Sequence, residues 1–414
     1  MIISKHYKKL GLRTKVAKKI TEIPADEWNK VFPNVCESYD FFKTLDESDL
    51  EQFRFYYIMV YDHKTPVGAT ACFLMNYSFD TTISGAYRHL SNSIKKLIPN
   101  IFSLKTLICG MPLGQGRVGL AGQADKILKA IVRRMEQIAK KNKAPILAFK
   151  DFNQADANAL ALLQKDGFTK LDGLPSTELN ITFTNFEDYL KTLSSDSRHN
   201  LRRKFKKIDR EGVINLEIVD ALESDNLDEV YRLYLDVVAR HEMGFELLPK
   251  DFFKNISKNM PKHVKFFLWK IDKKLVAFLF CLISEGICVD YYMGLDYSVA
   301  HRYHLYFIKF RDTIKWCIEN KIKKYEMGSF GYATKKRMRL NLIPLFIYVK
   351  LRNRALRPIF NFICHFLKFE SFDPDLKEAK KYMTKSVSDA KHLPHLCAPD
   401  QITIGKELPD CHKV

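Results

Sequence analysis

The sequence lacks any apolar run that approaches the roughly 20 residues needed to span a bilayer. The basic N-terminal stretch MIISKHYKKLGLRTKVAKK contains no continuous apolar core, so it does not resemble a secretory signal. Glycine and proline are scarce, at 17 and 15 of 414 residues, and no collagen-like, Gln-rich or Ser-rich tract occurs. Fibrous and low-complexity classes are therefore excluded. We expect a cytoplasmic protein, either soluble or peripheral on the inner membrane face.

The cysteines form no metal-binding or disulfide pattern. All nine are scattered singly, without a CxxC pair or a Cys/His cluster at zinc spacing. Cys72, Cys281, Cys288 and Cys317 lie inside apolar runs, where a free thiol behaves as a small core residue. The total of nine, an odd number of cysteines without an evident pairing, suits a reducing compartment, and we expect no metal.

Positive charge is abundant instead. The chain has 67 Lys and Arg against 48 Asp and Glu, a formal net charge of +19. A strongly basic protein tends to bind anions such as nucleic acid, anionic lipid or phosphate-bearing cofactors, and the charge alone does not choose among them. The hydrophobic fraction of 46% is typical of globular proteins, and the length suits two domains of about 150–200 residues.

The two halves of the chain share an order of predicted elements. Turn residues between two apolar runs predict a hairpin over 55–77 and another over 264–283. In each half a strand, a long helix and a short strand follow: 104–109, 124–141 and 145–149, then 287–293, 303–319 and 324–327. Further helices are predicted at 25–32, 40–46, 155–165 and 222–243, and strands at 178–183 and 345–350. We interpret the shared order as a weak internal duplication; a chance similarity between α/β hairpins is the alternative.

A basic segment, Ser195–Arg210, separates the halves. Asp196 or Ser197 is its predicted N-cap, and the apolar residues Leu201, Phe205 and Ile208 recur at helical spacing. Seven Arg and Lys residues occupy the rest of the helix. It is either a solvated helix packed by its three apolar residues or an anion-binding helix. We favour anion binding, through Arg198, Arg202, Arg203 and Lys206.

Several motifs in this order resemble a known family. They are RHNLRRK at 198–204, YYMGLD at 291–296 and YEMGSFGYATKKRMRLNLIPLFIYVK at 325–350. Together they resemble the Fem-like branch of the GNAT acyltransferase superfamily, loosely over residues 30–350 and more specifically over 195–350. The resemblance implies an α/β fold with two tandem GNAT-like domains, each a mixed, mostly antiparallel sheet flanked by helices. We expect domains at 1–190 and 191–352, a basic-aromatic helix at 353–370 and a polar tail at 371–414.

The resemblance also implies an activity: transfer of an acyl or aminoacyl group to an amine or hydroxyl of an anionic or cell-envelope-linked acceptor. The donor is acyl-CoA in GNAT enzymes and aminoacyl-tRNA in Fem-type enzymes. We favour an N-acyltransferase with acyl-CoA as co-substrate, although the second half lacks the glycine-rich loop typical of GNAT enzymes. The alternative is a non-catalytic module, a degenerate GNAT pair that binds tRNA or an anionic membrane surface. The oligomeric state is left open.

Candidate catalytic residues lie in the second half. Asp290 and Tyr292 end a strand expected at the sheet centre, where a carboxylate is costly to bury unless it is hydrogen-bonded. Tyr332 and Lys335 follow the next strand; Tyr332 could supply a proton, and Lys335 occupies the family's lysine position. The alternatives are an Asp bonded to neighbouring backbone and a basic surface turn.

Candidate donor-binding residues are Gly294, Arg302, His304 and Gly328. Arg302 could meet a phosphate, His304 could titrate near neutral pH, and Gly328 permits a sharp reversal. In the first half, the loop CGMPLGQGRVGLAGQ (109–123) partly matches the GNAT pyrophosphate pattern. A flexible strand-to-helix connection explains this loop equally well.

Near the C-terminus, RNRALRPIFNFICHFLK (352–368) places basic residues beside apolar ones, and Pro358 suits the first turn of a helix. The segment is either a helix lying on an anionic membrane or a helix docked on the core, and the sequence leaves both open.

Overall fold

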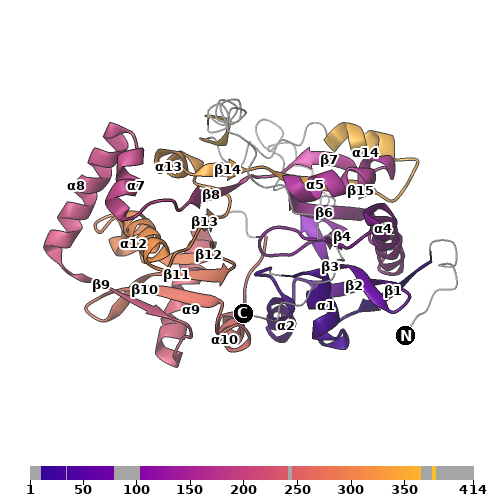
Figure 1. Cartoon of the computed structure of the whole chain (residues 1–414), viewed down its shortest axis with the longest axis horizontal. Coiled ribbons are helices and arrows are strands. Elements are labelled where there is room, and N and C mark those ends of the chain that lie inside the picture. The colour runs from indigo at the N-terminus through magenta and orange to yellow at the C-terminus, as the bar shows by residue number, and fades with distance from the viewer. Residues whose placement is uncertain (1–10, 34, 79–102, 241–244, 365–374, 379–414) are drawn as a thin grey trace, which may run out of the picture.

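A computed structural model gives the fold. It describes residues 11–33, 35–78, 103–240, 245–364 and 375–378. Within these residues the chain forms two α/β halves that lie side by side, each built on one sheet flanked by helices (Figure 1). The mixed, mostly antiparallel character expected of both sheets is confirmed, because β4–β6 and β12–β13 are the parallel pairs among the described strands.

The first sheet has the order β1-β2-β3-β4-β6-β15-β7, with β5 paired to β3. Its strands are β1 Leu12–Ala17, β2 Arg54–Asp62, β3 Thr65–Ser78, β4 Ser103–Cys109, β5 Gly119–Leu120, β6 Ile146–Asn153, β7 Thr169–Asp172 and β15 Leu345–Leu351. The predicted hairpin forms from β2 and β3. Alternate residues of β2 enter opposite cores, as expected for a strand covered on both faces: Ile58 packs with α4, and Tyr57 with α1 and α2.

Helices flank this sheet. They are η2 Ile20–Glu22, α1 Ala25–Val31, α2 Tyr39–Glu47, α4 Ala124–Lys141, α5 Gln154–Leu160, α6 Leu162–Lys165 and α14 Arg357–Cys364. The longest is α4, whose apolar residues Ile127, Ile131, Met135 and Ile138 recur every three or four positions and are buried.

The second sheet has the order β14-β8-β13-β12-β11-β10-β9. Its strands are β8 Ser176–Asn180, β9 Ile214–Val219, β10 Val264–Ile271, β11 Lys274–Ser284, β12 Ile287–Leu295, β13 Lys324–Met327 and β14 Asn341–Ile343. The accompanying helices are α7 Phe186–Thr192, α8 Ser195–Glu211, α9 Ser224–Arg240, α10 Lys250–Asn259, α11 Tyr297–Ala300, α12 Leu305–Glu319 and α13 Tyr332–Arg337. Helices α7, α8 and α12 share one core with the sheet, and α9 and α10 share the other.

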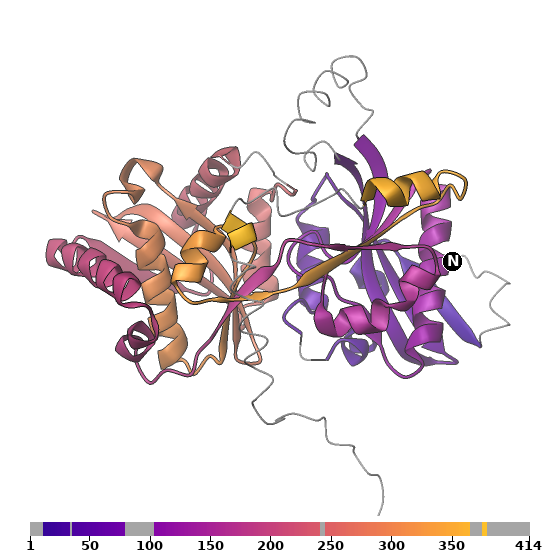
Figure 2. The same cartoon turned by 90° about the horizontal axis from the view of Figure 1, so that it is seen from above.

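The two sheets exchange strands. Strand β8 pairs with β13 and β14 in the second sheet, with Leu179 opposite Tyr325. Strand β15 returns to the first sheet and pairs with β6 and β7, with Tyr348 opposite Phe149. Figure 2 shows the two segments crossing between the halves. The pairing thus crosses the expected division at residue 190, which assigned β8 to the first domain and β15 to the second.

One hydrophobic core joins the halves. It contains Phe41 of α2 together with Phe252 of α10. Polar contacts reinforce this junction, since the Asn259 amide donates to the Thr44 hydroxyl at 3.1 Å and to the Glu47 carboxylate at 2.8 Å. The relative position of the halves is therefore fixed by packing and by hydrogen bonds.

Helix α8 begins earlier than predicted. Its N-cap is Ser194, whose hydroxyl accepts from the Ser197 backbone N–H at 3.3 Å, so the predicted caps Asp196 and Ser197 lie inside the first turn. The predicted apolar face is confirmed, because Leu201, Phe205 and Ile208 are buried. Gly212 ends the helix in the left-handed conformation that glycine favours at this position.

The C-terminal segments are described in part. Of the helix expected at 353–370, residues 357–364 form α14, and the remainder after Cys364 lies outside the described residues. The tail expected at 371–414 also lies outside them, apart from 375–378. Across the described residues, no helix combines the length and apolarity needed to span a membrane.

Candidate functional site

A cavity of about 270 Å³ lies between the halves, where two parallel strands part. The pairing of β12 with β13 ends at Asp290 opposite Met327, yet β12 continues to Leu295. The lining comes from both halves and includes Glu37, Gly114, Gln115, Arg117, Glu246, Glu285, Asp290, Tyr291, Tyr292, Glu326 and Gly328. The end of a parallel strand pair is a common place for a ligand in α/β proteins.

A β-bulge shapes the wall of this cavity. The register between β11 and β12 shifts so that Phe280 faces Tyr292 while the next residue, Cys281, faces Asp290. Tyr291 is therefore the extra residue of the bulge and has no partner on β11. As a result Tyr291 and Tyr292, although consecutive, both pack against the core shared by the halves.

Each of these tyrosines is hydrogen-bonded to a glutamate. The Tyr291 hydroxyl donates to Glu37 at 2.6 Å, and the Tyr292 hydroxyl donates to Glu246 at 2.6 Å. Burial and the adjacent carboxylates raise the pKa of both phenols. Both tyrosines therefore remain protonated hydrogen-bond donors at neutral pH.

The glutamates of the cavity differ in their partners. Glu37 is 5% exposed and also accepts from the Arg117 Nε at 3.1 Å, so its charge is balanced. Burial raises the pKa of Glu246 and of Glu326. The Gln115 amide is 3.5 Å from Glu326, the limit of a hydrogen bond. Glu326 is thus a carboxylate whose affinity for a proton is increased by its surroundings.

Asp290 forms an ion pair with a buried lysine. The Lys309 Nζ lies 2.6 Å from the Asp290 Oδ2, and the Tyr325 hydroxyl donates to the same oxygen at 3.0 Å. Burial opposes the charge of Lys309, but Asp290 and Tyr306 outweigh it and raise the pKa of the ammonium. The Asp290 carboxylate is consequently an ion-paired acceptor at the back of the cavity.

The structure brings together only some of the predicted site residues. Asp290, Tyr292 and Gly328 line the cavity. Tyr332 and Lys335 lie outside the lining and are buried. Tyr332 donates to the Pro175 carbonyl at 2.7 Å, and the Lys335 Nζ donates to the Met327 and Gly328 carbonyls at 2.7 and 2.9 Å. These contacts hold the loop after β13.

The predicted donor-binding residues are also dispersed. Gly294 lies in the core, where a Cβ would come within 2.4 Å of Phe278 and 2.7 Å of Leu233. Arg302 and His304 lie beside the N-terminus of α12, outside the lining of the cavity. Packing in the interior therefore explains Gly294 without any ligand.

The glycine loop of the first half has a packing role. The Gly116 N–H donates to the Asp151 carbonyl at 2.9 Å, and a Cβ at Gly116 would lie 2.2 Å from the Lys150 carbonyl oxygen. Gly114, with φ +76°, lies against the Tyr291 hydroxyl, where a Cβ would come within 3.0 Å of the oxygen. The loop thus forms part of the cavity wall, and its expected contact with a phosphate stays a prediction.

Sequence reasoning missed several residues of this site, among them Glu37, Glu246 and Lys309. Glu37 and Glu246 lie outside helices and strands and reach the cavity only through tertiary packing. Lys309 had a detectable signal, because it interrupts the apolar series Leu305, Ile308, Phe310 and Ile314 of α12. A lysine on the buried face of a helix indicates a buried partner.

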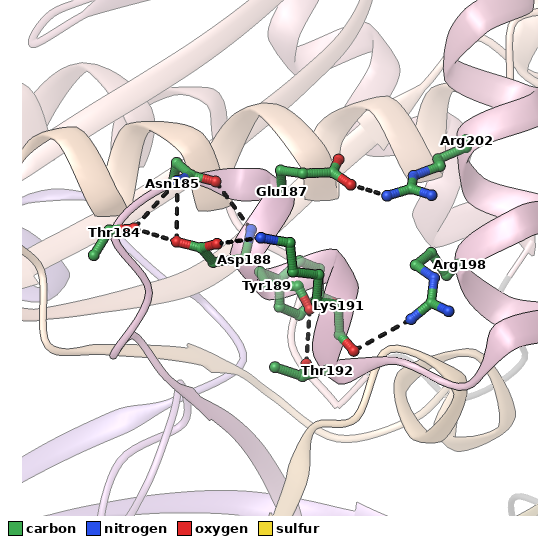
Figure 3. A network of polar contacts seen from close by, with 9 residues as sticks. All are labelled: Thr184, Asn185, Glu187, Asp188, Tyr189, Lys191, Thr192, Arg198 and Arg202. Carbon is green, nitrogen blue, oxygen red and sulfur yellow. Dashed lines mark hydrogen bonds and ion pairs between the residues drawn. The ribbon is translucent and has the colours of Figure 1, made fainter.

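Two of the four arginines and lysines predicted to bind anions are engaged within the protein (Figure 3). The Arg198 guanidinium donates to the Lys191 and Leu193 carbonyls at 3.3 and 3.4 Å, and Arg202 forms an ion pair with Glu187. Both contacts join α8 to α7. Arg203 and Lys206 are exposed.

A basic cluster lies where α8 approaches the N-terminus of α12. We define it by Lys204 and His304 together with the basic residues whose charges lower the pKa of these two: Arg203, Lys207, His301 and Arg337. Burial, followed by Arg203 and Arg337, lowers the pKa of Lys204. Burial, followed by Lys204 and Lys207, lowers the pKa of His304. An anion bound here would relieve this repulsion, and a helix N-terminus favours negative charge.

Among the described residues, no group of three or more His, Cys, Asp and Glu side chains is arranged to hold a metal ion.

Comparisons with known proteins extend these observations. The FemAB-like family model, described as peptidoglycan biosynthesis and recognition, matches residues 19–341. The crystal structure of FemX is similar with a TM-score of 0.54 and 13% identity, covering 84% of this chain and 100% of FemX. No curated protein matches.

Two further solved structures are similar. L-PGS from Bacillus licheniformis has a TM-score of 0.48 and 13% identity, covering 79% of this chain and 95% of its own. A tandem GNAT protein from the clavulanic acid biosynthesis pathway has a TM-score of 0.49 and 9% identity, covering 82% and 98%. The expected architecture, two α/β halves that each contain a mixed sheet flanked by helices, is confirmed by the structure and by its likeness to FemX.

Proposed function

Because this chain belongs to the FemAB-like family, we propose that it is a transferase of cell-envelope synthesis that moves an acyl or aminoacyl group onto an amine. The observation that carries the proposal is the cavity where β12 and β13 part, lined by protonated tyrosines and by glutamates of raised pKa. Acyl transfer to an amine needs groups that accept the amine's proton and groups that stabilise the oxyanion. The cavity contains residue types suited to both tasks.

The charges of the lining favour an amine over a hydroxyl. Glu246, Glu285 and Glu326 have no ion pair among the described residues, whereas Arg117 is paired with Glu37. A protonated amine would be attracted to these glutamates. The anionic part of an envelope-linked acceptor would bind outside the cavity, because the unneutralised side chains in the lining are acidic.

We assign the role of general base to Glu326. An attacking amine must lose a proton, and a carboxylate with a raised pKa is a better base than an ordinary glutamate. Burial gives Glu326 this property, and the residue lines the cavity beside Gly328. Asp290, paired with Lys309, would orient the amine as a fixed acceptor.

The tyrosines are suited to the oxyanion. When the amine attacks the donor's carbonyl carbon, negative charge develops on the carbonyl oxygen and is stabilised by preorganised donors. Tyr292 and Tyr291 stay protonated and face the cavity, so either hydroxyl could donate to that oxygen after exchanging its glutamate partner. The leaving group then departs as the C–N bond becomes an amide.

The basic cluster is the proposed binding site for the donor's phosphates. Both acyl-CoA and aminoacyl-tRNA carry phosphate, so the cluster does not choose between them. The donor is identified by incubating the protein with radiolabelled acetyl-CoA or with charged tRNA and an amine-bearing peptidoglycan precursor. Transfer from either donor supports the proposal. Absence of transfer from both, with no rise in melting temperature, contradicts it.

A second candidate is a non-catalytic module that binds anions, and the mutual repulsion within the basic cluster favours it. It predicts that tRNA binds with a steep dependence on salt, while neither acyl-CoA nor charged tRNA supports transfer. The assay above separates the two candidates.

A further inference from the structure

Helix α14 and the residue just before it carry the most exposed apolar side chains of the described residues. Leu356, Ile359, Phe362 and Ile363 are 51, 62, 66 and 53% exposed. The other exposed large apolar residues, which are scattered over the second half, reach at most 42%. Four such side chains within eight positions form a local patch, which soluble surfaces seldom carry without a binding role.

The inner side of the same helix is docked. Cys364 is 1% exposed, and Phe360 packs against the core shared by the halves. The helix lies on β7 and β15 of the first half (Figure 1). Residues 360 and 364 therefore define the buried side, while 359 and 363, also one turn apart, define the outer side. The helix is therefore docked on the core, which is one of the two alternatives left open by the sequence, and it also presents an apolar face to solvent.

Positive charge lies beside this face. The segment from Leu351 to Cys364 contains Arg352, Arg354 and Arg357 but no acidic residue. Arg352 donates to the Ala144 carbonyl at 2.9 Å, which places the end of α4 beside it. Three exposed lysines lie there, at 140, 141 and 143. The nearby Glu136 is neutralised by Lys350, at 2.7 Å.

We propose that the outer face of α14 docks this protein on an anionic phospholipid bilayer. The apolar side chains Ile359 and Ile363 would enter the interface between headgroups and acyl chains, and the arginines and lysines around them would contact lipid phosphates. Neither signal alone gives stable attachment, whereas a small apolar face combined with a basic patch does. A protein partner would also suit an apolar face, but the arginines of this segment and the three lysines after α4 match a negatively charged surface.

The test uses the full-length protein and sedimentation with lipid vesicles. Vesicles containing phosphatidylglycerol should bind the protein at least about tenfold more tightly than pure phosphatidylcholine vesicles, and salt should weaken that binding. Ile359→Ser with Ile363→Ser should reduce binding to the anionic vesicles by about tenfold or more. The matched control, Leu216→Ser with Leu235→Ser, removes two exposed leucines from the second half and should leave binding unchanged.

A gain-of-signal variant makes the test independent of any loss of stability. Ile359→Trp should show a blue-shifted fluorescence emission with phosphatidylglycerol vesicles and none with phosphatidylcholine. The proposal is overturned if the wild-type protein does not bind anionic vesicles, or if both serine variants bind alike. It is also overturned if Ile359→Ser with Ile363→Ser dissociates a dimer without changing vesicle binding, since a second copy of the chain would then cover this face.

Discussion

The Lys309 ammonium lies 2.6 Å from the Asp290 carboxylate, and both side chains are nearly excluded from solvent, at 1 and 9% exposure. Lys309 comes from α12 on one face of the second sheet, whereas Asp290 belongs to β12 at the parting of the strands. The pair fixes a negative charge at the back of the cavity.

Removing one member of this pair should be costly. Lys309→Met leaves the Asp290 carboxylate buried without its counter-ion, so we expect a loss of about 3–5 kcal/mol in the free energy of unfolding. Adding Asp290→Asn should restore much of that loss. Urea denaturation measures both, with Lys315→Met, at an exposed position on the same helix, as the control. Equal stability of the Lys309 and Lys315 variants would show that the pair contributes little.

The proposed base is tested at Glu326. Glu326→Gln keeps the shape of the side chain but cannot accept a proton, so kcat should fall by about 10²–10⁴-fold. The raised pKa also predicts that wild-type activity declines with falling pH at a value above that of an ordinary glutamate. Glu319→Gln, exposed at the end of α12, is the control. If Glu326→Gln retains both full activity and the acid limb of the pH profile, another group is the base.

The basic cluster should bind anions through Arg203 and Lys207. Replacing both with Gln should weaken tRNA binding and lower the slope of log affinity against log salt by about two, one for each lost phosphate contact. Arg198→Gln is the matched control, since the Arg198 guanidinium already donates hydrogen bonds to the Lys191 and Leu193 carbonyls. A larger loss of affinity in the control would place the anion site at the start of α8 instead.

Asp46 should make the stability of the folded protein decrease as the pH rises through about 6. Burial raises its pKa to about 6, although the Ile20 N–H and the Tyr57 hydroxyl donate to it at 2.6 and 2.8 Å. Between about pH 4 and 6, Asp46 is protonated in the folded protein and ionised in the unfolded chain. The contribution of the protonated carboxyl group to the free energy of unfolding is therefore complete at about pH 4 and is lost as the pH rises through about 6. Asp46→Asn should remove it.

Thermal unfolding of both proteins at several pH values between about 4 and 7 measures this effect. The melting temperature of the wild type, relative to Asp46→Asn, should fall as the pH rises. A constant difference between the two proteins would mean that Asp46 titrates alike in the folded and unfolded states.

Local patterns predicted much of the fold. The helix 124–141 and the strands 264–271 and 324–327 have the predicted bounds, because amphipathic periodicity and turn residues determine them locally. The predictions omitted β1, β9 and α10, which are short and whose apolar content is modest or shared with neighbouring elements. The exchange of β8 and β15 was not foreseen, because strand pairing depends on contacts between residues far apart in the chain.

The candidate site was predicted less completely. Asp290 and Tyr292 were found because polar residues at the end of a central strand are unusual. Lys335 was chosen by its place in a family motif, yet its ammonium binds carbonyls of the adjacent loop. Glu37 and Glu246 carry no local signal, since acidic residues in loops are ordinarily solvated. Only the packing of α2 against α10 and the bulge at Tyr291 bring them to the cavity.

The return of β15 to the first sheet has a consequence for biosynthesis. This strand lies between β6 and β7, so until residue 351 has left the ribosome the sheet has a gap, with two unpaired strand edges facing each other. The N-terminal half therefore cannot complete its folding before the second half has been made, unlike most N-terminal domains. The chain must be made as far as residue 351 before either edge is closed, and during that interval a chaperone would protect the nascent chain from pairing with another copy.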